Sequence, residues 1–155
     1  MIYTYENIIN SIADQLAAIF PATGGGCRYP IRRSPSEDTA YPCFYIFLML
    51  PEMSDELAGV QKRTTSLDII FVQQRNAPDQ YGAIMAVLEA LDAGFDMLTY
   101  TDGESTWPLH VLDRNASIED QELHYHITLQ QRVSLPVAVD LMQTMEEANV
   151  EIKEH

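Results

Sequence analysis

The chain has 155 residues, of which 46% are hydrophobic and 21% are charged. This length and composition fit one globular domain with its own core and exclude a disordered chain. The net charge of −14, from 23 acidic and 9 basic residues, disfavours binding that depends on Lys and Arg contacts to nucleic-acid phosphates. The longest apolar run, YPCFYIFLML at 41–50, is about half the roughly 20 residues that a membrane-spanning helix needs.

The ends and the cysteines favour a cytoplasmic protein. The first residues, MIYTYENIIN, show neither the basic nor the apolar region of a secretory signal. Two cysteines, Cys27 and Cys43, do not make a disulfide framework and are interpreted as reduced thiols, with Cys43 a small buried side chain.

The first half of the chain predicts one helix and three strands. Thr4 is a suitable N-cap, and an apolar stripe follows at helical spacing: Ile8, Ile9, Ile12, Leu16, Ile19 and Phe20. Pro21 ends this helix, and a short edge strand is expected at 29–33. The run at 41–50 predicts a strand with two apolar faces, one with Cys43, Tyr45, Phe47 and Met49, the other with Phe44, Ile46, Leu48 and Leu50.

Residues 51–59, PEMSDELAG, are interpreted as an acidic connector, and 61–74 as a long strand. The first half of that strand is polar on both faces, which suggests a protruding hairpin with the preceding strand at 41–50. Its second half, from Leu67 to Val72, is core-like.

The second half of the chain predicts another helix, three strands and a final helix. Asn76 is the expected N-cap, with Pro78 in the first turn, Asp79 at the positive helix end, and a buried stripe of Tyr81, Ile84, Met85, Leu88, Leu91, Phe95 and Leu98. Asp102-Gly103 predicts a tight hairpin. In the last strand the inward set is Leu123, Tyr125, Ile127, Leu129 and Val133, and the outward set is His124, His126, Thr128, Gln130 and Arg132.

The predicted fold class is α+β, in the order α-β-β-β-α-β-β-β-α. We expect a mixed or antiparallel sheet of about five or six strands, with two main helices on one face. Residues 1–135 would form the single domain, and 136–155 an acidic C-terminal helical extension.

No motif for catalysis stands out. His124 and His126 share one strand face, and His110 on a neighbouring strand could complete a three-histidine cluster, so a zinc-dependent enzyme is one hypothesis. Solvated strand histidines are the preferred interpretation, because no ligand motif with a second shell accompanies them. No nucleophile motif or dinucleotide fingerprint is present. We therefore predict a non-enzyme with no catalytic residue, no cofactor and no metal.

The element order and several segments resemble a known family. A first helix ends at "FP", YPCFYIFLML follows a polar connector, and then come KRTTSLDIIFVQQ, the helix YGAIMAVLEAL, a Gly-turn hairpin and ELHYHITLQQRV. From Thr4 to Val133 this pattern resembles the tail terminator, or tail completion, proteins of bacteriophages and prophages.

The resemblance implies a structural protein that forms a hexameric ring, caps the tail tube and joins it to the head. Its partners would be copies of itself and the tail-tube and head-completion proteins, with no specific nucleic-acid binding, and it would move from the host cytoplasm to the virion tail. Acidic side chains lining the ring would let DNA pass without binding it. Expected subunit-interface residues are Arg28, Arg32, Arg33, Phe44, Ile46, Leu48, Lys62 and Arg63. The alternative is a small acidic adaptor or inhibitor of a basic protein partner.

Overall fold

The computed structural model describes residues 4–34, 40–56, 59–74, 76, 78–103 and 105–133. Within these residues the chain is an α+β domain of two helices and a curled seven-stranded sheet. The elements are α1 (Tyr5–Ile19), β1 (Ile31–Arg32), β2 (Cys43–Leu48), β3 (Glu52–Asp55), β4 (Gln61–Val72), α2 (Gln80–Gly94), β5 (Leu98–Asp102), β6 (Ser105–Glu119) and β7 (Glu122–Val133). The predicted class is confirmed. The predicted helix after Pro136, and the proposed division at 135/136, lie outside the described residues.

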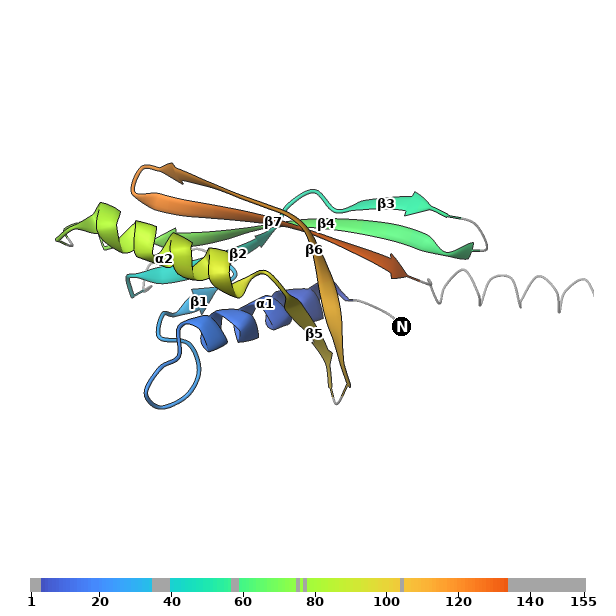
Figure 1. Ribbon diagram of the computed structural model, residues 1–155, viewed down its shortest axis with the longest axis horizontal. Helices are drawn as coiled ribbons and strands as arrows, with labels where there is room; N and C mark the ends of the chain where they lie inside the picture. The colour runs from blue at the N-terminus through green and yellow to red at the C-terminus, as the bar shows by residue number, and fades with distance from the viewer. Residues whose placement is uncertain are drawn as a thin grey trace, which may run out of the picture.

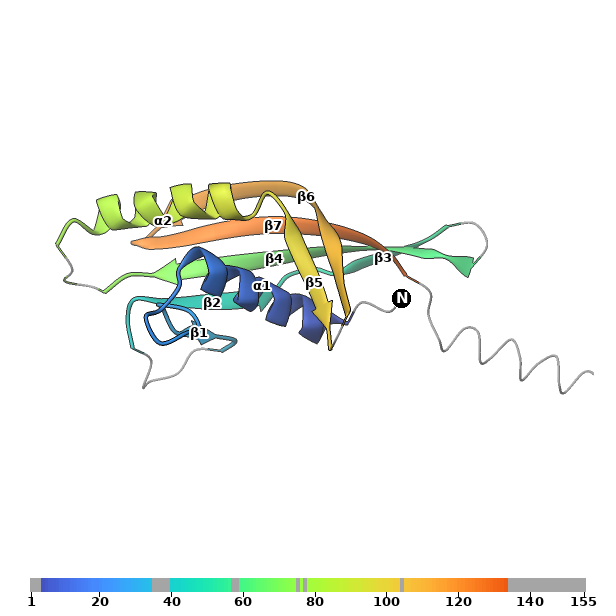
Figure 2. The ribbon, with the colours of Figure 1, turned by 60° about the horizontal axis from the view of Figure 1, so that its bottom comes forward.

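The sheet has the strand order β1-β2-β4-β7-β6-β5, with β3 paired to β4. The short edge strand β1 is parallel to β2, and every other pairing is antiparallel. The register of β6 shifts between Val111 and Asp113, and its first part turns away with β5 to pass beside α1 (Figures 1 and 2). The Ser11 hydroxyl of α1 accepts a hydrogen bond from the Thr101 backbone N–H at 3.0 Å, which ties the helix to β5. A bulge bends a strand, so the sheet curls around α1.

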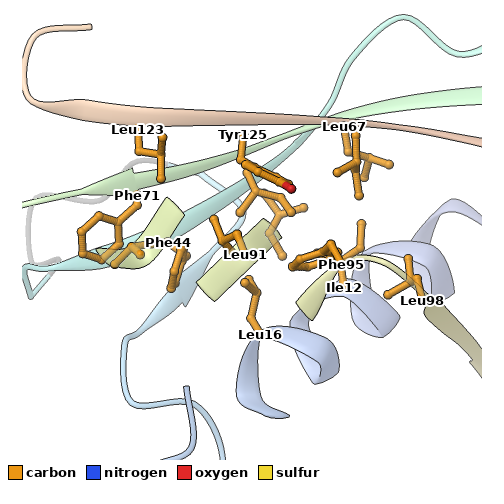
Figure 3. Close-up of a cluster of buried hydrophobic side chains, with 14 of the residues drawn as sticks. Ile12, Leu16, Phe44, Leu67, Phe71, Leu91, Phe95, Leu98, Leu123 and Tyr125 are labelled. Carbon is orange, nitrogen blue, oxygen red and sulfur yellow. The ribbon is translucent and has the colours of Figure 1, made fainter. Parts of the chain in front are cut away.

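Both helices cover the same face of the sheet. Figure 3 shows core side chains of α1 meeting those of the strands, with Leu91 and Phe95 of the α2 region between them. Alternate residues of the central strands supply the sheet side of this core: Phe44, Ile46, Leu67, Ile69, Phe71, Leu123, Tyr125, Ile127 and Leu129. The period-two pattern predicted for β7 is confirmed, since its inward set is buried.

The strand count is higher than predicted because residues 52–55 form β3 instead of part of a connector. β3 pairs with the polar first part of β4, from Glu52 opposite Thr64 to Asp55 opposite Gln61. All four β3 residues are exposed, so no buried side chain marks the strand in the sequence. β3, residues 61–64 of β4 and residues 130–133 of β7 form an arm that projects beyond α2 (Figures 1 and 2). A protrusion was predicted at this place, but its hairpin partner was wrong, because the first part of β4 pairs with β3 and not with the strand at 41–50.

The helix starts test the capping predictions. Thr4 is the N-cap of α1, and its hydroxyl accepts a hydrogen bond from the Asn7 backbone N–H at 3.1 Å. For α2 the predicted cap Asn76 was wrong, because Asp79 is the N-cap, but the prediction that Asp79 lies at the positive helix end is confirmed. The Asp79 carboxylate accepts from the Gly82 N–H at 3.3 Å, and Pro78 lies before the helix.

The buried stripe of α2 also differs from the prediction. Tyr81 is 61% exposed and Met85 is 42% exposed, whereas Val87 is buried beside Ile84 and Leu91. The later helix start leaves Tyr81 in the first turn, where the sheet does not cover it.

Candidate functional site

The face of the sheet opposite the helices is uncovered by any described helix, and we call it the open face. Strand alternation fixes its members. They are Cys43, Tyr45 and Phe47 of β2; Lys62, Thr64, Ser66, Asp68, Ile70 and Val72 of β4; and Glu122, His124, His126, Thr128, Gln130 and Arg132 of β7. This face carries two features, an apolar hollow and a cluster of ionisable groups.

The apolar hollow lies where β2 and β4 pair. It has a volume of about 300 Å³ and is lined by Tyr41, Tyr45, Phe47, Ile70, Val72 and Glu122. The rings of Tyr45 and Phe47 stack with centroids 5.9 Å apart. Cys43 on the same face is fully buried, and burial raises the pKa of its thiol. A buried thiol with a raised pKa is unreactive, so Cys43 contributes to packing and is not a nucleophile. That part of the sequence prediction is confirmed.

The ionisable cluster lies in the centre of the sheet. Strand pairing sets Asp68 of β4 opposite His126 of β7. His124 lies two residues before His126, on the same face of β7. One Asp68 oxygen, Oδ2, is 3.0 Å from His124 Nδ1, and the other, Oδ1, is 3.5 Å from His126 Nε2. The carboxylate of Glu122 lies 3.4 Å from His124 Nε2. Two imidazoles therefore converge on one carboxylate.

The electrostatics of the cluster follow from this packing. Burial alone would lower the pKa of His124, but the hydrogen bond to Asp68 and the negative charges of Asp68 and Glu122 outweigh it, so the pKa is raised. The side chain of Asp68 is only 13% exposed, and its Oδ1 atom is buried without a hydrogen-bond partner. An unpartnered buried carboxylate oxygen is unfavourable unless a cation compensates it.

The histidine prediction is correct in part. His124 and His126 share a face as expected, but they are not simply solvated, being 19% and 32% exposed and directed at Asp68. His110 lies opposite Gln130 in the β6–β7 register, so it does not join them. Asp68 was the member that the sequence reasoning missed. Its signal was a single carboxylate within the otherwise apolar half of a strand.

Two apolar residues expected at a subunit interface are not on a surface. Phe44 and Ile46 are 0% and 2% exposed and lie in the core under the helices, so this expectation was wrong. Both faces of the strand are apolar, and the sequence alone did not say which one the helices cover. Leu48 is 37% exposed at the end of β2, and the open-face aromatic residues are Tyr45 and Phe47.

The basic candidates are dispersed. Arg28 and Arg32 are exposed near β1, whereas Arg33 contacts the Asn10 side chain at 2.6 Å and Glu6 at 3.6 Å. Lys62 lies on the open face of the arm, in a hollow lined by Glu52, Met53, Ser54 and Thr64.

Arg63 lies on the opposite face of the arm from Lys62. It is 6% exposed, and its guanidinium lies 4.4 Å from the centroid of the Tyr5 ring. This contact within the subunit removes Arg63 from the set of exposed interface candidates.

Comparison with known families identifies the family of this chain. A family model described as phage tail terminator protein matches residues 7–138. The chain belongs to the phage tail terminator family. The resemblance drawn from the sequence is confirmed, and the match spans all seven strands, α2 and most of α1. A comparison with curated proteins gave no match.

Family membership makes this terminator a structural protein of the phage tail. Neither of the described helices has the length and apolar character needed to cross a membrane.

Proposed function

We propose that this terminator caps the finished tail tube and joins it to the head as a closed ring of identical subunits. The observation that carries the proposal is the family match over residues 7–138, which includes the whole described sheet. A ring needs two different surfaces on each subunit, since head-to-tail contacts are heterologous. An apolar region of β2, the open face and the arm, and a basic region near β1, supply such surfaces.

The first surface is apolar. Large apolar side chains are exposed from the end of β2 into the arm: Leu48, Met49, Leu50 and Met53, with Leu50 82% exposed. The apolar hollow on the open face involves the same strand through Tyr45 and Phe47, and Tyr41 in its lining is 46% exposed. Exposed apolar side chains gathered in one region are typical of a binding surface. In the ring, a neighbouring subunit covers this region.

The second surface is basic. Arg28 and Arg32 are exposed and form no salt bridge with any residue in the described part of the chain. With 23 acidic residues per subunit, a neighbour offers many carboxylates. Exposed ion pairs contribute only about 0–1 kcal/mol each, so the apolar contact supplies most of the assembly free energy and the arginines set its orientation.

The proposed partners are the tail-tube protein and the head-completion proteins. Deleting the gene from the phage or prophage that carries it should give heads and tails that fail to join, visible by electron microscopy. Intact tailed particles from the deletion strain would refute the proposal.

A complementation series then tests the ring contact. Phe47→Glu places a charge in the apolar hollow and should abolish rescue, because an unpaired charge in a covered apolar contact is strongly unfavourable. Tyr81→Glu is the matched control, since Tyr81 is 61% exposed on α2, away from both surfaces. Circular dichroism of each variant separates failed assembly from failed folding. Equal rescue by both variants would remove the open face from the interface and leave the role in the tail untouched.

A further inference from the structure

We propose that Asp68, His124 and His126 form a binding site for a divalent transition-metal cation of the Zn²⁺ type. The three side chains each offer one ligand atom, and these atoms all lie within 4.8 Å of one another. Imidazole nitrogen and carboxylate oxygen are the ligand types that zinc accepts, and three protein ligands leave a fourth position for water.

The distances within the cluster suit a small cation. Ligands at about 2.0–2.1 Å from a tetrahedral zinc are separated by roughly 3.3 Å from one another. His124 Nδ1 lies 3.0 Å from Asp68 Oδ2 and His126 Nε2 lies 3.5 Å from Asp68 Oδ1, so each imidazole is near this spacing from one oxygen of the carboxylate. The three ligand atoms all lie within 4.8 Å of one another, so binding would draw them closer around the cation.

Glu122 provides the support that metal-bound histidines require. A ligating imidazole almost always donates its other N–H to a carboxylate or carbonyl, which fixes the tautomer. The carboxylate of Glu122 lies 3.4 Å from His124 Nε2, on the side of the ring away from Asp68. When Nε2 carries the proton and donates it to Glu122, the lone pair of Nδ1 is directed at the cation position.

A second observation supports a cation at this position. Asp68 Oδ1 is buried and has no hydrogen-bond partner, although it lies beside His126 Nε2. A bound cation would satisfy this oxygen. The backbone also holds the ligands in place, because the two strands pair continuously from Gln61–Val133 to Val72–Glu122. Sites built on paired strands are more rigid than sites on loops.

The site would strengthen the subunit where it meets its neighbours. Phe47 of the apolar hollow is the β2 partner of Asp68 in the sheet register. A cation that joins β4 to β7 at this point makes the open face stiffer without needing any reactive chemistry. The inference does not depend on the proposed ring, since the ligands come from one subunit.

The test uses the untagged full chain, stripped of metal with a chelator. Titration with Zn²⁺ in a calorimeter should show one equivalent bound per subunit, and Co²⁺ should give the visible absorption of a tetrahedral site. Asp68→Asn and His126→Asn should each remove the Co²⁺ spectrum. Glu122→Gln should retain the spectrum but weaken Zn²⁺ binding about 10- to 100-fold.

His110→Asn is the matched control, because His110 is an exposed strand histidine outside the cluster. It should bind Zn²⁺ like the unmodified chain. A thermal melt of each variant without metal shows whether it folds, and added Zn²⁺ should raise the melting temperature of the unmodified chain but not of Asp68→Asn. Absence of one-equivalent binding, or binding that survives Asp68→Asn and His126→Asn in folded protein, would overturn the site.

Discussion

The two faces of the central sheet are made by the same strands, yet they differ in chemistry and in what covers them. On β4 the residues facing the helices, Leu67, Ile69 and Phe71, are 0–1% exposed and purely apolar. The residues between them, Asp68 and Ile70, reach the open face, where an ionisable cluster lies beside an apolar hollow. Folding free energy therefore comes mainly from one face, which leaves the other free for binding. Because side chains alternate between the two faces of a strand, one strand can contribute to the core and to a binding surface.

The largest expected effect on stability comes from a comparison of two phenylalanines on β2. Phe44→Ala removes a ring that is 0% exposed and packs against Phe20 and Phe71, so it should lower the free energy of unfolding by about 3–5 kcal/mol. Phe47→Ala removes a half-buried ring that stacks on Tyr45, and its loss should cost about 0.5–1.5 kcal/mol. Urea unfolding of the two variants measures both values.

The same pair separates stability from assembly. Phe47→Ala should weaken rescue of the deletion strain more than its small loss of stability explains, whereas Phe44→Ala should act only through misfolding. If the two variants lost equal stability, the open face would be part of the folding core and the contrast between the faces would fail.

A smaller effect is expected from the phenol of Tyr125, which links the core of the sheet to α2. Tyr125 is 0% exposed, and its hydroxyl donates to Asp92 of α2 at 2.9 Å. Burial and the Asp92 carboxylate raise the pKa of Tyr125 to about 12, so the phenol stays protonated at neutral pH. Tyr125→Phe should lower the free energy of unfolding by about 0.5–1.5 kcal/mol.

Asp92→Asn is the control for Tyr125→Phe, because the amide oxygen still accepts the hydrogen bond. It should be milder than the tyrosine variant in urea unfolding. A Tyr125→Phe protein as stable as the unmodified one would mean that the ring alone, and not its hydrogen bond to α2, stabilises the helix-covered face.

Secondary structure was predicted best from the sequence where buried side chains recur at a regular spacing. The α1 stripe and the alternation of β7 follow from side chains that must leave water, and each is confirmed. The Thr4 cap is confirmed too, and it follows from a side-chain oxygen that accepts a backbone hydrogen bond. The tight hairpin predicted at Asp102-Gly103 is also confirmed, although Asp102 belongs to β5 and pairs with Ser105, so the turn begins at Gly103. Glycine makes that turn visible, because Gly103 has a φ of +59°.

Elements without a regular spacing of buried side chains were harder to predict. β3 is exposed throughout, so only its hydrogen bonds to β4 define it. The turn between β6 and β7 uses Asp120 and Gln121 at φ of 48° and 67°, with no glycine to mark it. The cluster on the open face required the β4–β7 register, which sets Asp68 opposite His126. This register joins residues far apart in the chain, so no local pattern in the sequence predicts it.

The smallest expected effect concerns the exposed side of the arm, away from the contact between Arg63 and the Tyr5 ring of α1. Here Arg132 Nε forms an ion pair with a Glu56 carboxylate oxygen, 2.9 Å away, and the arginine side chain is 74% exposed. Because water screens such a pair, Arg132→Ala should change the free energy of unfolding by only about 0–1 kcal/mol. A double-mutant cycle with Glu56→Ala, followed by urea unfolding at low and high salt, isolates the pair. A coupling energy of about 0–1 kcal/mol would mean that backbone pairing of β3, β4 and β7, and not this ion pair, holds the arm in shape. A coupling energy above about 2 kcal/mol would contradict this and show that the ion pair stabilises the fold.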